Sequence, residues 1–275
     1  MSTLFNRKGA RCSAIVLTCC LLGGCALWDM LTAHPGGDSG SQAEVRKHDV
    51  IVRPEGAGPV PAVILLHGCG GPTARDRLWA ERLRSWGYLT LRVNSLAPRG
   101  LTRVCGGGIL PPEARVPDVL AGLAYLRSLP DVDSHRIALM GWSHGGSTTL
   151  MTLGAGSENS AESFRAAIAF YPGCRRVKPW RVKTATLLLL GAADDWTAPT
   201  PCQALAERQQ RAGFDVTQVT YSGAQHGFDN PLLGPNPRRV RDALGGRGAT
   251  IQYNSAAAED SLDRVRAFLA KHLEP

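Results

Sequence analysis

The segment from Ile137 to Leu153, with the sequence IALM-GWSHG-GSTTLMTL, decides the fold. Its first four residues are an apolar run typical of a buried strand, and the stretch Ser147–Leu153 favours a helix. The pentapeptide between them fits the pattern Gly-x-Ser-x-Gly. Between a strand and a helix this pattern predicts a nucleophile elbow, a tight turn that exposes Ser143 at the carboxyl end of the strand. A Cβ atom at either glycine would collide with neighbouring backbone, and the positive end of the helix dipole favours negative charge beside the serine. The alternative is an ordinary glycine-rich turn with a capping serine.

The chain around this elbow alternates short apolar runs with longer amphipathic stretches from about Asp49 onward. Strands that alternate with helices of about 10–15 residues imply a mostly parallel sheet with helices on both faces. We therefore expect one α/β domain over residues 44–275, with no insertion large enough for a lid. Besides the elbow segment, strands are predicted over Val60–Leu66, Tyr88–Val93, Ala166–Tyr171, Thr186–Leu190 and Val216–Tyr221, and helices over Arg75–Ser85, Val116–Leu129, Cys202–Ala212 and Asp260–Leu273.

The elbow serine needs partners, because a serine hydroxyl is a weak nucleophile until a base takes its proton. In an α/β fold with a nucleophile elbow, an acid and then the base follow the serine along the chain. The loop after one predicted strand contains Asp194 and Asp195, and the loop after the next contains His226. We predict Ser143 as the nucleophile, His226 as the general base and Asp194 as the acid that orients the imidazole. Asp195 is the alternative acid, and its other interpretation is a solvated turn carboxylate.

A second glycine-rich loop, His67-Gly68-Cys69-Gly70-Gly71, follows the first long apolar run. Attack on a carbonyl group places negative charge on its oxygen, and fixed backbone N–H groups stabilise that charge. We expect one N–H group from His144, directly after the nucleophile, and a second from Cys69. An ordinary glycine-rich turn is the alternative interpretation of this loop.

Together these motifs resemble the α/β-hydrolase superfamily, and within it the dienelactone-hydrolase-like proteins. The resemblance covers about residues 60–230, and rests on Leu65–Gly71, Gly141–Gly145, Phe170–Gly173, Asp194 and His226–Phe228. It implies an α/β-hydrolase fold and a hydrolase that uses no cofactor. Authentic dienelactone hydrolases use a cysteine nucleophile, whereas this chain has Ser143. The serine favours cleavage of carboxylic esters or lactones through an acyl-enzyme over the specialised lactone chemistry.

Two other functions are open at this level. The same three residues would serve an acyltransferase or a peptidase, because the shape of the pocket decides the acceptor. A non-catalytic envelope lipoprotein that keeps the fold is the other alternative. Arg99 and Arg103 lie in the loop 94–108, which we expect to border the pocket, and they are either a clamp for a substrate carboxylate or solvated loop charges.

The first 25 residues are typical of a bacterial export signal. Arg7, Lys8 and Arg11 precede a short apolar run, and Leu-Gly-Gly-Cys25 resembles a lipobox. We expect a signal peptide over residues 1–24, a lipidated Cys25 that anchors the protein in a membrane, and a flexible tether over residues 25–43. Residue 26 is Ala, which points to the periplasmic side of the outer membrane. A plain cleaved signal peptide and an uncleaved helix are the alternatives.

Charge and cysteine content limit the partners. The net charge of +8 falls to about +5 without the leader. The sequence has no continuous stripe of Lys and Arg residues, so we do not expect nucleic-acid binding. The cysteine and histidine spacing does not fit zinc, so we expect no metal.

Four cysteines remain after the leader and Cys25, and in an oxidising compartment an even number favours disulfides. We expect Cys69–Cys105 and Cys174–Cys202, because these loops should be neighbours. Four reduced, buried thiols are the alternative.

Overall fold

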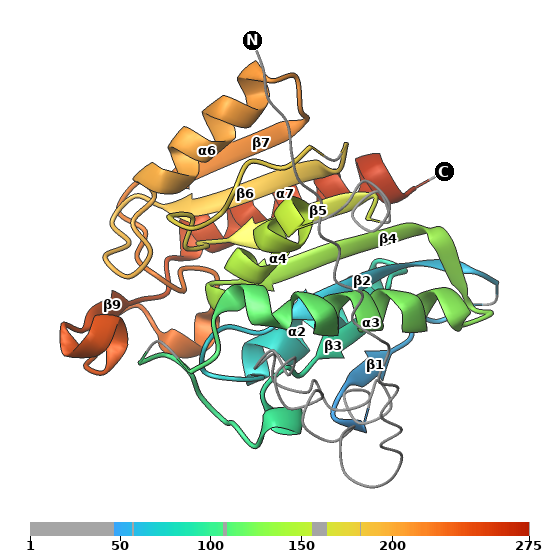
Figure 1. Ribbon diagram of the computed structural model, residues 1–275, viewed down its shortest axis with the longest axis horizontal. Helices are drawn as coiled ribbons and strands as arrows, with labels where there is room; N and C mark the ends of the chain where they lie inside the picture. Colours follow the sequence, from blue (N-terminus) through green and yellow to red (C-terminus); the bar gives the residue numbers. More distant parts are fainter. Residues whose placement is uncertain (1–46, 57, 107–108, 156–163, 182, 275) are drawn as a thin grey trace, which may run out of the picture. The chain divides into compact units, whose positions relative to one another are not determined.

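The computed structural model describes residues 47–274, apart from 57, 107–108, 156–163 and 182. In this part of the chain the main sheet has seven strands in the order β1-β3-β2-β4-β5-β6-β7 (Figure 1). All neighbouring pairs are parallel except β1–β3, which is antiparallel. The strands are β1 Val50–Val52, β2 Val60–Leu66, β3 Leu89–Val93, β4 Val132–Trp142, β5 Ala166–Phe170, β6 Ala185–Gly191 and β7 Val216–Tyr221.

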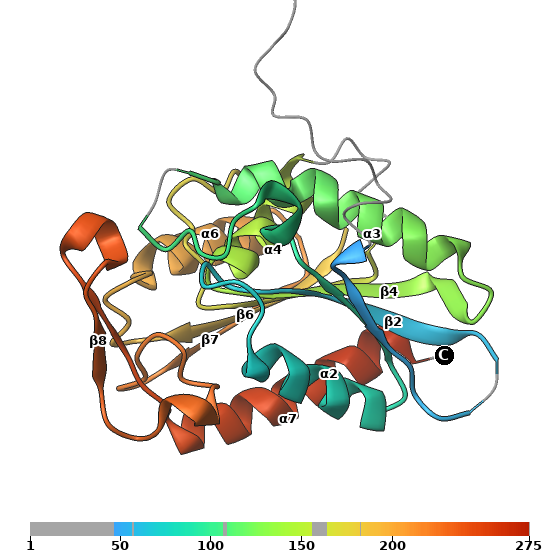
Figure 2. The ribbon, with the colours of Figure 1, turned by 90° about the horizontal axis from the view of Figure 1, so that it is seen from below.

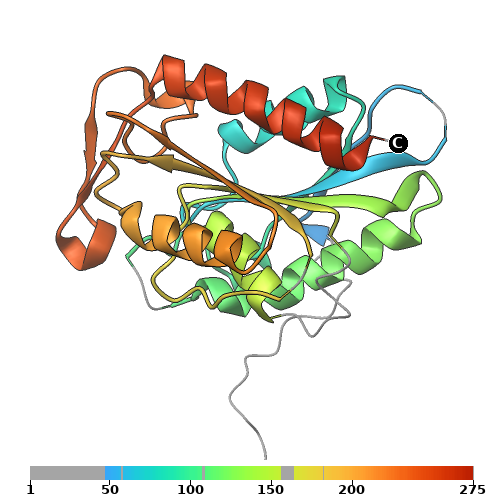
Figure 3. The same cartoon turned by 90° about the horizontal axis from the view of Figure 1, so that it is seen from above.

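Helices cover both faces of this sheet (Figures 2 and 3). Alternate residues of β2 point to opposite faces, so Val63 and Leu65 join the core under α2 and α7, while Ile64 and Leu66 join the core under α3. The remaining helices, α4 and α6, pack on the same face as α3 and share a further apolar cluster with β5 and β6. The helices are α2 Ala74–Ser85, α3 Val116–Ser128, α4 His144–Ala155, α6 Thr200–Arg211 and α7 Ser255–Leu273.

A small antiparallel hairpin lies outside the main sheet. Its strands β8 Arg238–Val240 and β9 Ala249–Ile251 pair with each other, and Gln252 donates a backbone hydrogen bond to the His226 carbonyl at 3.1 Å. The hairpin therefore sits against the loop that carries His226. Short 3-10 helices complete the described elements: η1 Ala97–Arg99, η2 Pro112–Arg115, η3 Pro231–Leu233 and η4 Ala243–Gly246.

The observed elements confirm the predicted α/β architecture, with differences at the ends. Strand β4 begins at Val132 instead of Ile137, because the polar residues 133–136 hide a strand that pairs with β2 from Val60 onward. Helix α4 begins at His144, directly after the elbow serine, and α7 begins at Ser255. The short strand β1 and the β8–β9 hairpin were absent from the prediction. Within the described ranges, the connections between the strands of the main sheet contain turns, α-helices and short 3-10 helices, and the hairpin follows β7.

Both expected disulfides are present. Cys69 pairs with Cys105 and Cys174 pairs with Cys202, with Cα–Cα distances of 4.8 and 5.1 Å. The alternative of four reduced thiols is therefore wrong. Cys69–Cys105 connects two loops, and Cys174–Cys202 connects a loop to the first turn of α6, both at the carboxyl edge of the sheet where the predicted site residues also lie.

The expected signal peptide, the lipidated Cys25 and the tether lie outside the described residues. Within the described ranges, no helix combines the length and the apolar character needed to cross a bilayer.

Candidate active site

The Gly141–Gly145 turn has the strained geometry that the sequence predicts. Ser143 has a φ of +52°, in the left-handed region that non-glycine residues rarely occupy. A Cβ atom at Gly141 would lie 2.3 Å from the Gly145 carbonyl oxygen, and one at Gly145 would lie 2.2 Å from the Leu66 carbonyl oxygen. Only glycine fits at either position, so the turn stays tight and Ser143 is held at the end of β4.

The three predicted catalytic side chains form one hydrogen-bonded row. Ser143 Oγ lies 2.9 Å from His226 Nε2, and His226 Nδ1 lies 2.8 Å from Asp194 Oδ2. Because the carboxylate only accepts, the imidazole places its proton on Nδ1 and leaves the Nε2 lone pair for the serine hydroxyl. All three residues are buried, and Ser143 keeps 7% of its surface exposed, so the hydroxyl remains reachable from the cavity beside it.

Asp194 is fixed as an ionised acceptor by the turn that follows β6. Its Oδ1 accepts the backbone N–H groups of Trp196 and Thr197 at 2.9 and 2.8 Å, and the Thr197 hydroxyl lies 2.9 Å from Oδ2. Burial alone would raise the pKa of Asp194, but His226 and these hydrogen bonds outweigh burial and hold the pKa below its ordinary value of 3.8.

Asp195, the alternative acid, points away from His226. It forms an ion pair with Arg239 Nη1 at 2.9 Å and accepts hydrogen bonds from the backbone and hydroxyl of Thr250 at 2.7 and 3.0 Å. Its side chain is therefore neither the partner of His226 nor a merely solvated turn carboxylate. It attaches the β8–β9 hairpin to the turn after β6.

The two segments expected to stabilise an oxyanion, the loop 67–71 and the end of the elbow at His144, both lie next to Ser143. An added Cβ atom at Gly68 would lie 3.7 Å from Ser143 Cβ, so the loop 67–71 packs directly on the elbow. Cys69 and His144 line the same cavity of about 400 Å³ as Ser143, together with Cys105. The backbone N–H groups of Cys69 and His144 remain our prediction for the donors.

A buried cation lies under both of these loops. Arg115 is fully buried, and its Nη1 is 3.0 Å from the His67 carbonyl oxygen and 3.0 Å from His144 Nδ1. His144 Nε2 lies 2.9 Å from the Leu110 carbonyl oxygen, so the ring donates from Nε2 and accepts the Arg115 N–H group. Burial and then Arg115 lower the pKa of His67 to about 3 and that of His144 to about 4. Burial likewise lowers the pKa of Arg115, to about 10.

A second buried network supports the other side of the site. Asp229 Oδ2 accepts the indole N–H groups of Trp79 and Trp142 at 3.0 and 2.9 Å, and Asp229 Oδ1 accepts the Tyr171 hydroxyl at 2.6 Å. Tyr171 has a φ of +35°, and its ring centroid lies 4.6 Å from that of His226. One carboxylate thus connects α2, the elbow, the end of β5 and the loop that carries His226.

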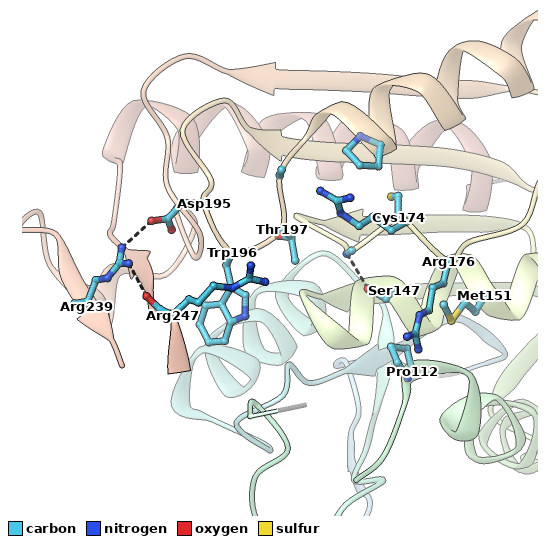
Figure 4. Close-up of a pocket in the computed structure, with 15 residues that line it drawn as sticks. Pro112, Ser147, Met151, Cys174, Arg176, Asp195, Trp196, Thr197, Arg239 and Arg247 are labelled. Atoms are coloured by element: carbon cyan, nitrogen blue, oxygen red, sulfur yellow. Dashed lines mark hydrogen bonds and ion pairs between the residues drawn. The ribbon is translucent and has the colours of Figure 1, made fainter. Parts of the chain in front are cut away.

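A larger cavity of about 880 Å³ adjoins the first, and Figure 4 shows side chains that line it. Both cavities are lined by Ser147, Trp196 and Thr197. The predicted border role of the loop 94–108 is confirmed at Val104, Cys105 and Gly106, which line the smaller cavity.

The structure places the two loop arginines in ion pairs with carboxylates of the chain. Arg99 binds Asp118 through two nitrogens at 2.8 and 3.0 Å, and Arg103 binds Asp242 through two nitrogens at 2.9 Å. Both guanidinium groups are paired with carboxylates of the chain itself, so the structure does not contain a substrate clamp made from these two residues.

Sequence reasoning missed three contributors to the site. Thr197 follows the predicted acid by three residues, the spacing at which a carboxylate accepts the N–H groups of a turn. Asp229 follows His226 by three residues and lies directly after the apolar Phe228. Arg115 follows Pro111 and Pro112 in a segment with no strand or helix pattern of its own, and nothing in the sequence marks it as buried.

This fold and this site define a class: proteins of the α/β-hydrolase fold, here with a serine, a histidine and an aspartate connected by hydrogen bonds. More narrowly, the chain belongs to the dienelactone hydrolase family, whose family model matches residues 48–273.

Known proteins resemble the chain at moderate levels. Over 54% of its length and 48% of the relative's, it is 30% identical to the quorum-quenching protein AidA of Acinetobacter baumannii. The chain spans about half or less of the length of the curated relatives that it matches.

Among solved structures, a putative dienelactone hydrolase from Klebsiella pneumoniae superposes with a TM-score of 0.63 at 20% identity, over 81% of this chain and 92% of that one. Esterase 2 of Thermogutta terrifontis, phosphorylated by paraoxon, superposes with a TM-score of 0.60 at 19% identity, over 82% and 90% of the two chains. At these identities the likeness concerns the fold.

Proposed function

We propose that this protein hydrolyses carboxylic esters through an acyl-enzyme on Ser143. One observation carries the proposal: Ser143 Oγ, the His226 imidazole and the Asp194 carboxylate form a continuous row with contacts of 2.9 and 2.8 Å. This is the arrangement in which a base activates a hydroxyl while an acid fixes the tautomer of that base.

In the first half of the reaction, His226 Nε2 takes the Ser143 proton while Oγ bonds to the carbonyl carbon of the ester. The carbonyl oxygen becomes an oxyanion, which the N–H groups of Cys69 and His144 stabilise. When the tetrahedral intermediate collapses, the bond to the alcohol breaks and His226 gives its proton to that alcohol. Asp194 stays ionised throughout and stabilises the imidazolium.

In the second half, His226 deprotonates a water molecule that attacks the acyl-enzyme. The carbonyl bond to Ser143 Oγ breaks, His226 returns the proton to Oγ, and a carboxylic acid leaves. The serine distinguishes this chemistry from that of dienelactone hydrolases with a cysteine. A serine hydroxyl needs a general base to remove its proton during the attack, whereas a thiol of low pKa depends less on such a base. The cavity beside Ser143, of about 400 Å³, offers space for the reacting ester group.

The test combines turnover with covalent labelling. We expect Ser143→Ala to lower kcat for p-nitrophenyl acetate by about 10⁶-fold, as removal of a serine nucleophile does elsewhere, and to abolish labelling by a fluorophosphonate. Ser128→Ala, at the end of α3, is the control and should keep both. A Ser143→Ala variant that turns over or labels like the wild type refutes the proposal. Competing alcohols and peptides in the same assay separate hydrolysis from acyl transfer and peptidase activity.

We also propose that the protein is an exported lipoprotein on the periplasmic side of the outer membrane. The leader with its Leu-Gly-Gly-Cys25 sequence supports export, and two disulfides suit an oxidising compartment. Metabolic labelling with palmitate should mark the wild type and not Cys25→Ser. Equal labelling of the two, or recovery of the wild type from the cytoplasm alone, contradicts this proposal.

A further inference from the structure

The larger cavity is built as an extension of the catalytic one. Ser147 is one helical turn after Ser143, with its backbone N–H group 2.8 Å from the Ser143 carbonyl oxygen, and it lines both cavities. Trp196 and Thr197, which bind the triad carboxylate through their backbone, line both as well. The two cavities therefore meet at these three residues, next to Ser143, and the larger one offers about 880 Å³ for a second part of an ester bound there.

Positive charge is concentrated around this second space. Four arginines line it, from three different segments, against a single carboxylate, Asp195. That carboxylate is already engaged by one of the four, Arg239, at 2.9 Å. Figure 4 shows Arg176 and Arg247 on opposite sides, with Thr197 and Ser147 between them in this view and Trp196 beside Arg247. The side chains that line the cavity therefore carry a net formal charge of +3, from four arginines and one aspartate.

The chemistry of this lining favours a particular ligand group. The charged lining residues other than Asp195 are all arginine, whose planar fork matches the oxygens of carboxylate and phosphate groups. A net formal charge of +3 exceeds what one carboxylate neutralises and suits a dianion with three oxygens. Met151, Pro112 and the Trp196 ring supply apolar surface for a chain that links this group to the ester.

We propose that the cavity recognises a phosphate-type dianion carried by the ester substrate. This rests on the proposed function, since the ester must react at Ser143 while its anionic end lies among the arginines. The substrate class is then an ester whose acyl chain ends in a phosphate or phosphonate. The neutral and monoanionic analogues bind the same catalytic residues and lack this anchor.

The experiment uses three p-nitrophenyl esters of matched chain length: the neutral pentanoate, the hydrogen glutarate with one terminal carboxylate, and the 4-phosphonobutanoate. We expect kcat/KM to rise in that order, through KM, and the preference to shrink as salt screens the arginines. The pocket variant is Arg175→Gln with Arg176→Gln. Its kcat/KM for the phosphonate ester should fall by about tenfold, the size expected for partly exposed charge-assisted contacts, and stay within about twofold for the pentanoate.

The control variant is Arg181→Gln with Lys183→Gln, which removes the same charge from the same basic segment at exposed positions that do not line the cavity. It should leave all three esters within about twofold.

A wild type that hydrolyses the pentanoate but gains nothing from the phosphonate overturns this inference and leaves the proposed function intact. So does a glutarate ester that matches the phosphonate, or a control variant that loses as much as the pocket variant. A wild type that hydrolyses none of the three esters, or p-nitrophenyl acetate, overturns both.

Discussion

Removing the Cys69–Cys105 disulfide should cost both stability and turnover. The two cysteines are 36 residues apart, and closing a loop of that length restricts the unfolded chain by about 4 kcal/mol in the chain-entropy model. For a domain of this size that corresponds to a fall in Tm of roughly 10 °C. Cys69→Ala with Cys105→Ala avoids leaving a single reactive thiol and avoids burying a new hydroxyl.

The same variant should lower kcat, because Cys69 is one of the two expected oxyanion donors and its loop loses a covalent attachment. Removal of an oxyanion donor costs about 10²–10³ in kcat, so a donor that is loosened and still present should cost roughly tenfold. The matched control is Cys174→Ala with Cys202→Ala. That disulfide closes a loop of similar separation, 28 residues, and neither cysteine lines the cavity that holds Ser143.

Urea unfolding and turnover of p-nitrophenyl acetate measure the two effects on both variants. The free energy of unfolding should fall by similar amounts in the two, within about 1 kcal/mol, while kcat falls only in the Cys69–Cys105 variant. Equal losses of kcat in both variants would show that the disulfides act through global stability. An unchanged kcat in the Cys69–Cys105 variant would show that the attachment of this loop does not matter for the reaction.

Three further predictions concern neighbouring groups. Asp194→Asn should lower kcat by about 10⁴-fold, since the wrong tautomer of the base is favoured, whereas Asp195→Asn should stay within a few-fold on a neutral ester; similar losses in both would reassign the acid. Arg115→Met should lower kcat by roughly tenfold with little change in KM, because the guanidinium connects the two oxyanion loops and does not contact the substrate cavity; a change in KM alone would contradict this role. His67 and His144 titrate far below the ordinary value of 6.5 in the folded protein, so the unfolded chain binds more protons between about pH 6.5 and pH 4 and the free energy of unfolding falls as pH drops through that window. His144→Gln should make this fall shallower in urea unfolding at each pH, and an unchanged slope would refute the assignment.

The parts of the site that follow from local chain geometry were predictable from sequence. The elbow depends on two glycines, because a Cβ atom at either position would lie 2.2–2.3 Å from a backbone carbonyl oxygen. The Gly-x-Ser-x-Gly pattern therefore predicts the geometry of the turn directly. Asp194 and His226 were found because the carboxyl ends of parallel strands meet at one edge, which makes the position of each loop as informative as its residues.

The parts that depend on tertiary contacts were not predictable. Arg115 is a charged residue with no exposed surface, and a charged residue in an irregular segment is ordinarily expected at the surface. Strands β1, β8 and β9 have three residues each, too few for an alternating pattern to be recognised. They form because β1 pairs with β3 and because β8 and β9 pair with each other. The contacts that hold Asp195 away from His226 come from Thr250 and Arg239, which lie far along the chain.

The positive φ of Ser143 has an evolutionary consequence. A left-handed backbone costs a residue with a side chain about 1–2 kcal/mol, and glycine would be relieved of that cost. In a descendant that no longer needs hydrolysis, replacement of this serine by glycine would therefore increase the stability of the fold. We therefore expect related chains that have lost the reaction to carry glycine at this position, and related chains that catalyse it to carry a residue with a nucleophilic side chain.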